Sequence, residues 1–134
     1  MTPGEIYQRY LMASAITRDA DALAGLFAVD GVLESPLIPP GHHYPRRLEG
    51  REEIRAGMAA FYERRPADPS QTVDTARSGF QLHTTADPGV FIVEIDVVLS
   101  SPAGTENVSL VQIFRVHDGK IVLMRDYFAP AIVD

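Results

Sequence analysis

The sequence predicts an α+β fold in which helices cover one face of a curved antiparallel sheet. Two observations lead to this prediction. The first half of the chain, up to residue 66, repeats apolar residues at helical spacing, whereas residues 71–128 form extended runs separated by short turns. Helices followed by a long meander are typical of a sheet with helices on one side. A strand meander this long must bend, so we expect a pocket between the sheet and the helices.

Length and composition indicate one soluble domain spanning residues 1–134. Apolar residues make up 46% and charged residues 22% of the chain, and 12 basic against 18 acidic residues give a net charge of −6. This balance argues against nucleic acid or an anionic membrane as a partner. The longest aliphatic or aromatic run is VFIV (90–93), far too short to span a bilayer, and no signal peptide is visible, so we expect a cytoplasmic protein.

The first two helices are predicted from their start signals. Thr2 can act as an N-cap and Pro3 suits the first helical position, so a helix is expected over 3–17. Asp19 or Asp21 can cap a second, short helix that follows.

The third helix is expected over 50–66. Its glutamates lie near the positive end of the helix dipole and its arginines near the negative end, and Pro66 stops it. Before it, 31–36 is predicted to be a strand, and 36–47, with four prolines, a loop at the rim of the pocket.

The second half predicts an antiparallel meander. The turn sequences ADPG, SPAGTE and HDG separate four strand-like runs, at 71–85, 90–100, 107–116 and 120–128.

The last run places one carboxylate on an apolar face. Side chains alternate across a strand, so Asp126 shares a face with Met124 and Phe128. Burying an ion is costly unless a partner or a function compensates for it. Asp126 is therefore either a functional acid or one half of a structural ion pair with Arg125, Arg115 or Arg77.

The HDG turn predicts which residues face Asp126. A three-residue loop with Gly119 in the left-handed conformation keeps the apolar faces together. In this register Gln112 opposes Met124 and Leu110 opposes Asp126, so Gln112 and Asp126 are diagonal neighbours and the only polar groups on their shared face.

Glu94 and Asp96 have two interpretations. The 90–100 run has a wholly apolar face, so the two acids either face solvent on the other side or face the same pocket as Asp126. In the second case Asp96, Leu110 and Asp126 would lie in one row across three strands.

Four segments together resemble the SnoaL-like branch of the nuclear transport factor 2-like superfamily. These segments are QRY, LFAVDGVLESP, GREEIRAGM and IFRVHDGKIVLMRDYF. The resemblance implies a cone-shaped, cystatin-like roll in which the curved sheet wraps around three helices and encloses a ligand pocket. It also implies a homodimer formed through the outer face of the sheet. The same cone supports several reactions and also occurs in non-enzymes, so it does not define one activity.

The resemblance implies roles for two acids. The acid/base aspartate of polyketide cyclases matches Asp126. In enzymes similar to limonene epoxide hydrolase, the two carboxylates match Asp96 and Asp126, but Glu94 stands at the arginine position, so that set is incomplete.

Ketosteroid isomerases match less well. Their helix-one tyrosine matches Tyr10, but Ser35 stands at the base position and Gln112 at the second acid. Phenazine-biosynthesis A/B proteins have a glutamate where Asp126 stands, so most of these patterns agree on this position.

These observations predict cofactor-independent acid/base chemistry, of the cyclase or isomerase kind, on a small hydrophobic metabolite. An epoxide-hydrolase-like activity with altered carboxylates and a non-catalytic binding or dimerisation module are the alternatives. No metal is expected, because the adjacent His42 and His43 lack ligand spacing. The candidate catalytic residues are Asp126, Asp96 and Glu94, and the candidate substrate-binding residues are Tyr10, Leu33, Ser35, Met58, Leu110, Gln112, Phe114, Met124 and Phe128.

Overall fold

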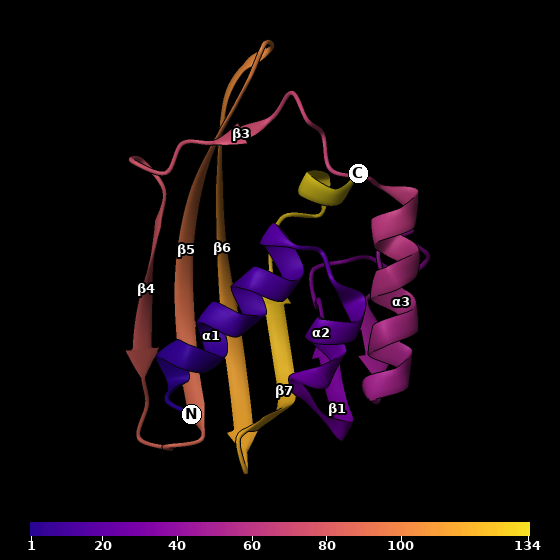
Figure 1. Ribbon diagram of the computed structural model, residues 1–134, viewed down its shortest axis with the longest axis vertical. Coiled ribbons are helices and arrows are strands. Elements are labelled where there is room, and N and C mark those ends of the chain that lie inside the picture. Colours follow the sequence, from indigo (N-terminus) through magenta and orange to yellow (C-terminus); the bar gives the residue numbers. More distant parts are fainter.

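The computed structural model describes residues 1–134 and has two layers (Figure 1). One layer is a seven-stranded sheet, and the helices lie against one of its faces. We call the face toward the helices the inner face and the opposite one the outer face. The arrangement confirms the predicted α+β class.

The elements follow the predicted order. The helices are α1 (Pro3–Leu11), α2 (Ala20–Gly25) and α3 (Arg51–Arg64), with a π-helical turn at Met12–Ile16 and a 3-10 turn at Pro130–Val133. The strands are β1 (Phe27–Glu34), β2 (Arg47–Glu49), β3 (Thr72–Val73), β4 (Gly79–Thr84), β5 (Val90–Ser101), β6 (Gly104–His117) and β7 (Lys120–Tyr127).

Some boundaries differ from the predicted ones. The predicted helix over 3–17 changes from α to π geometry after Leu11, and the predicted run 71–85 is two short strands rather than one. The loop 36–47 ends in β2, which pairs with β1. The expected caps are present, since Thr2 accepts from the Glu5 backbone at 3.2 Å and Asp19 from that of Ala22 at 3.0 Å.

The sheet is antiparallel at every pairing except one. The strand order is β2-β1-β7-β6-β5-β3, and β4 also pairs with β5. β1 lies parallel to β7, because the chain crosses over through α3 and the meander before it returns as the last strand. This parallel pair brings the first strand of the chain beside Asp126.

The β6–β7 turn has two residues rather than the predicted three. His117 pairs with Lys120, and Asp118 and Gly119 both have positive φ (50° and 74°), as in a type I′ turn. A bulge at Val122 then shifts the pairing by one residue. Gln112 and Asp126 share a face as predicted.

Because of the shorter turn and the bulge together, Gln112 pairs directly with Asp126 rather than with Met124. The predicted pairing of Leu110 with Asp126 is therefore also wrong. Gln112 and Asp126 are cross-strand partners, which brings their side chains closer than the predicted diagonal arrangement would.

The register of the β5–β6 hairpin also differs from the prediction. A tight turn joins Ser101 to Gly104, so Asp96 pairs with Ser109 and Ile95 pairs with Leu110. The predicted row of Asp96, Leu110 and Asp126 does not form.

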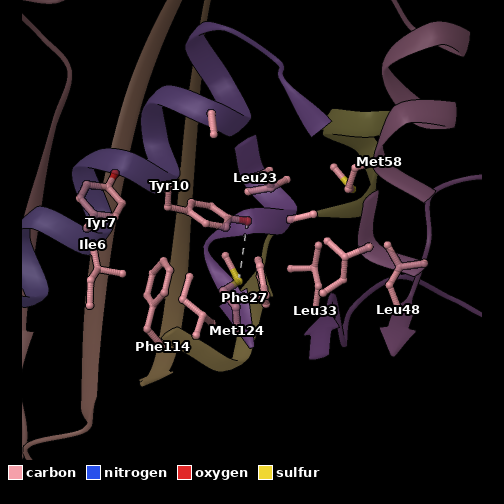
Figure 2. Packing of buried hydrophobic residues seen from close by; sticks show 14 of the residues in the cluster. Ile6, Tyr7, Tyr10, Leu23, Phe27, Leu33, Leu48, Met58, Phe114 and Met124 are labelled. Carbon is pink, nitrogen blue, oxygen red and sulfur yellow. Dashed lines mark hydrogen bonds between the residues drawn. The ribbon is translucent and has the colours of Figure 1, made fainter. Parts of the chain in front are cut away.

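The hydrophobic core fills the space between the inner face and the helices (Figure 2). Phe114 is at its centre: its ring stacks on Phe91 at 4.7 Å and receives the edge of Tyr10 at 5.2 Å. Tyr7 also packs on Phe114 from α1. The aromatic residues of α1 and of the sheet thus join the two layers at Phe114, one inner-face row along the sheet from the pair of Gln112 and Asp126.

Candidate functional site

A polar row interrupts the apolar inner face. Successive strand pairings place Val93, Gln112 and Asp126 side by side on β5, β6 and β7. On β1, Glu34 pairs with Arg125, so continuing the parallel register places the buried Ser35 beside Asp126. Gln112 on β6, Asp126 on β7 and Ser35, the residue after β1, therefore lie on one face.

Asp126 has one polar partner and no cationic one. Its Oδ1 accepts a hydrogen bond from Gln112 Nε2 at 3.3 Å, and it takes part in no salt bridge. Its side chain is half-buried. Burial raises the pKa of Asp126 to about 7, and the bond from Gln112 lowers it only in part.

The arginines considered as partners for Asp126 lie elsewhere. Arg125 faces the outer side of the sheet, 3.8 Å from Glu34, which also pairs with Arg47 at 2.5 Å. Arg77 pairs with Asp74 at 2.7 Å, and Arg115 is exposed and takes part in no salt bridge. The ion-pair interpretation of Asp126 is therefore wrong, and its charge on the inner face is not neutralised by a cation.

Three tyrosines interact electrostatically with the carboxyl group. Burial, and after it the charge of Asp126, raises the pKa of Tyr7, Tyr10 and Tyr44. The Tyr10 hydroxyl points at the sulfur of Met124, at 3.9 Å (Figure 2). Its only hydrogen-bond partner is thus a weak acceptor, which leaves the hydroxyl available to a stronger one.

Most of the predicted substrate-binding residues belong to the packed core. They are Tyr10, Leu33, Met58, Phe114, Met124 and Phe128, all buried. Figure 2 shows Tyr10, Phe114 and Met124 close together at the centre of the drawn cluster. The interior near Asp126 is therefore filled by side chains in this conformation, and the principal surface hollows are lined by other residues.

A half-buried apolar strip begins beside the polar row. Ile95 pairs with Leu110 and Val97 with Val108, one and two rows further along the β5–β6 hairpin from Gln112. All four are only partly buried, and alternation places them on the inner face. We call these four residues the apolar strip; it leads along the inner face to Asp126.

Glu94 and Asp96 lie on the outer face, away from Asp126. Each follows a residue that packs into or against the core, Val93 and Ile95 respectively, so alternation turns both acids outward, where they are exposed. Glu94 binds His83 at 2.5 Å, and Asp96 accepts from the Ser109 hydroxyl at 2.6 Å. The structure therefore does not bring these two candidates into the site.

The proline-rich loop is tied to the C-terminal segment. The rings of His42 and His43 stack at 4.3 Å, and they bind the carboxylate of Asp134 and the carbonyl of Val133, both at 2.6 Å. No group of three or more His, Asp or Glu side chains is arranged to hold a metal ion.

Sequence analysis missed Tyr44 as a site residue. It lies in the proline-rich loop, yet it is buried and packs edge-on against Phe61 and Phe128 at 4.7 and 5.3 Å. A single aromatic residue between His43 and Pro45 has no periodicity, so the usual signal of a buried residue was missing. Its size and the apolar Ile38 nearby in the loop were the only hints.

The fold and this site define a cone-type α+β protein with one carboxyl group on its inner face. The chain matches the SnoaL-like domain over residues 7–124 and belongs to that family. It is 35% identical over 114 residues to an uncharacterised PhzA/B-like protein of Pseudomonas aeruginosa, a match that covers 84% of this chain and 74% of the relative. No helix is long and apolar enough to cross a membrane.

Solved structures support the same fold. A proposed isomerase from Bacillus subtilis superposes with a TM-score of 0.71 at 20% identity, covering 96% of this chain and 87% of that one. A proposed polyketide cyclase from Pseudomonas putida superposes with a TM-score of 0.63 at 21% identity, covering 96% of this chain and 92% of that one. At these identities the likeness shows the fold and not the reaction.

Proposed function

We propose that this protein is a cofactor-independent acid/base enzyme, of the cyclase or isomerase kind, that acts on a small hydrophobic metabolite. Asp126 carries the proposal: it is a carboxyl group on an apolar inner face, it has no cationic partner, and its pKa is raised to about 7. Such a group is about half protonated at neutral pH, so it can both accept and return a proton.

The expected chemistry is proton transfer beside a carbonyl group. Asp126 removes a proton from the carbon, and charge then develops on the carbonyl oxygen as an enolate forms. The phenols of Tyr7, Tyr10 and Tyr44 stay protonated, because burial and Asp126 raise each pKa, so they can donate hydrogen bonds to this oxygen. Return of the proton to another carbon, or attack of the enolate on a second carbonyl, gives isomerisation or ring closure.

The apolar strip suggests where the substrate lies. Its four residues are half-buried and end at the row that holds Asp126, so a hydrophobic ring placed on them would reach the carboxyl group. Because the interior beyond Asp126 is packed, this side of the inner face is the more open approach.

Two alternatives have different support. An epoxide-hydrolase-like activity requires a second carboxylate beside Asp126. Asp96, the candidate for this carboxylate, faces outward, so the structure gives this alternative less support. A non-catalytic binding module needs only the apolar strip and a closed interior, so it remains the main competitor.

A proton-exchange assay separates enzyme from binding module. In D2O, wild-type protein should accelerate exchange of the α-protons of 2-tetralone, a bicyclic ketone, as followed by proton NMR. Asp126→Asn should lower this acceleration by about 10²–10⁴-fold, the usual contribution of a general base. Asp96→Asn, a matched change on the outer face, should leave it unchanged.

The proposal fails in two cases. If Asp126→Asn exchanges as fast as wild type, Asp126 is not the base. If wild type binds ring ketones without accelerating exchange, the protein is a binding module.

A further inference from the structure

Half of the Gln112 side-chain amide has no partner inside the protein. Gln112 is 6% exposed, and its Nε2 donates to Asp126. Its Oε1 is buried and accepts no hydrogen bond, and it is one of three such side-chain atoms in the structure. Buried carbonyl oxygens are nearly always paired, so this atom requires an explanation.

The charge of Asp126 accounts for the orientation of the amide. A carboxylate can only accept hydrogen bonds, so it must face the NH2 group of Gln112. Oε1 then points to the other side of the amide. The pairing with the charged form of Asp126 thus creates an acceptor that this form cannot satisfy.

The neighbours of Gln112 on the inner face cannot satisfy it either. Its cross-strand neighbour on β5 is Val93, and the residues two positions away on its own strand are Leu110 and Phe114. These side chains carry no hydrogen-bond donor. No side chain donates to Oε1 in the structure, and the nearby hydroxyl of Tyr10 is directed at Met124 instead, so this acceptor is open to a donor on a bound molecule.

We infer that Gln112 Oε1 accepts a hydrogen bond from an O–H or N–H group of the substrate, and that the substrate is a ring compound carrying such a donor near its reacting carbon. Enols, phenols and hydroxyketones belong to this class; ethers and unsubstituted ketones lack the donor and should bind more weakly, although an unsubstituted ketone can still exchange its α-protons at Asp126. The inference rests on the proposed function only for the position of the reacting carbon. Gln112 is then a specificity-determining residue, and Asp126 remains the acid/base.

Matched ligand pairs test this without turnover. One pair is 2-naphthol and 2-methoxynaphthalene, which differ by a methyl group on the oxygen, and naphthalene is added as a third probe. Dissociation constants are measured by NMR titration of the intact protein. Leaving a buried acceptor unpaired is costly, so wild type should bind the naphthol at least about tenfold more tightly than either other compound.

Variants assign the preference to Gln112. Gln112→Met keeps the length of the side chain but removes the amide. The ratio of the dissociation constants of 2-methoxynaphthalene and 2-naphthol should therefore fall to nearly one. Gln81→Met, the same change at an exposed site on β4, should keep the wild-type ratio. If Gln112→Met does not fold, the wild-type preference and its loss on methylation still decide the matter.

Equal affinity for naphthol and its methyl ether in wild type, or binding of neither, would overturn the inference, as would a preference that Gln112→Met retains. These outcomes are separate from failure of the proposed function. Exchange of ketone protons without a hydroxyl preference refutes only the role of Gln112, and a hydroxyl preference without exchange refutes only the acid/base role of Asp126.

Discussion

Replacing Asp126 with Asn should stabilise the protein at alkaline pH and have much less effect at acidic pH. The folded protein raises the pKa of Asp126 from its ordinary 3.8 to about 7. Between these values the folded state holds a proton that the unfolded state has released. Stability contributed by the neutral carboxyl is therefore lost as the pH rises from about 4 to about 7, and it stays lost above that.

The size of the effect follows from the pKa difference. One pKa unit equals about 1.4 kcal/mol, so full burial would correspond to about 4 kcal/mol above pH 7. Asp126 keeps partial contact with solvent, which reduces the cost, so we expect ~2–4 kcal/mol. The Asn variant avoids this cost because its amide is neutral at every pH, and its NH2 group can also donate to the unpaired Gln112 Oε1.

Urea unfolding followed by circular dichroism at pH 4.5, 6 and 8 measures the difference. The free energy of unfolding of Asp126→Asn should exceed that of wild type by an amount that grows with pH over this range. Asp96→Asn, on the exposed outer face, should show no such growth. A difference between Asp126→Asn and wild type that is constant with pH would contradict this prediction, because it would mean that Asp126 has the same pKa in the folded and unfolded states.

Three further predictions concern the fold and the assembly. Gly31→Ala should destabilise the protein by about 1–3 kcal/mol, because the added Cβ would lie 2.8 Å from the Ile121 carbonyl oxygen; urea unfolding measures it. Phe114→Ala should cost about 3–5 kcal/mol in the same assay, since it removes a fully buried ring from the centre of the core. We propose that the protein is a homodimer through the outer face, as the family resemblance implies, so Val111→Lys should shift it to monomer in analytical ultracentrifugation.

Each of these has a control. Gly79→Ala adds a Cβ that meets nothing within 4 Å, and Phe80→Ala removes a ring that is 45% exposed, so both should cost less than their counterparts. Ile16→Lys alters an exposed apolar residue on the helix side and should leave the dimer intact. A wild-type protein that sediments as a monomer would contradict the proposed dimer.

The shared face of Gln112 and Asp126 could be predicted from the sequence, because alternation along two strands sorts apolar from polar side chains. Their direct pairing could not. The two-residue turn alone would have placed Gln112 beside Arg125, and the bulge at Val122 restores the shared face. Nothing in the composition around Val122 indicates a bulge. Without a bulge, only a three-residue turn keeps the apolar faces of the two strands together, so the sequence predicted that turn.

Glu94 and Asp96 show a second limit of sequence patterns. Both faces of β5 carry valine or isoleucine, so the pattern alone allowed either orientation of the two acids. Phe91 and Val93 pack into the core, and this packing turns Glu94 and Asp96 to the outer face. Tyr44 was missed for a related reason, since an irregular loop gives no periodicity from which burial can be inferred.

The central claim is that Asp126 is an acid/base with a pKa near neutrality. Titration of its carboxyl carbon by NMR, with Asp126→Asn used to assign the signal, tests this most directly. Burial of Asp126 on the inner face should give a midpoint near pH 7. A midpoint at or below the ordinary 3.8 would show that the carboxyl is solvated or paired with a cation, and the acid/base proposal would then be wrong.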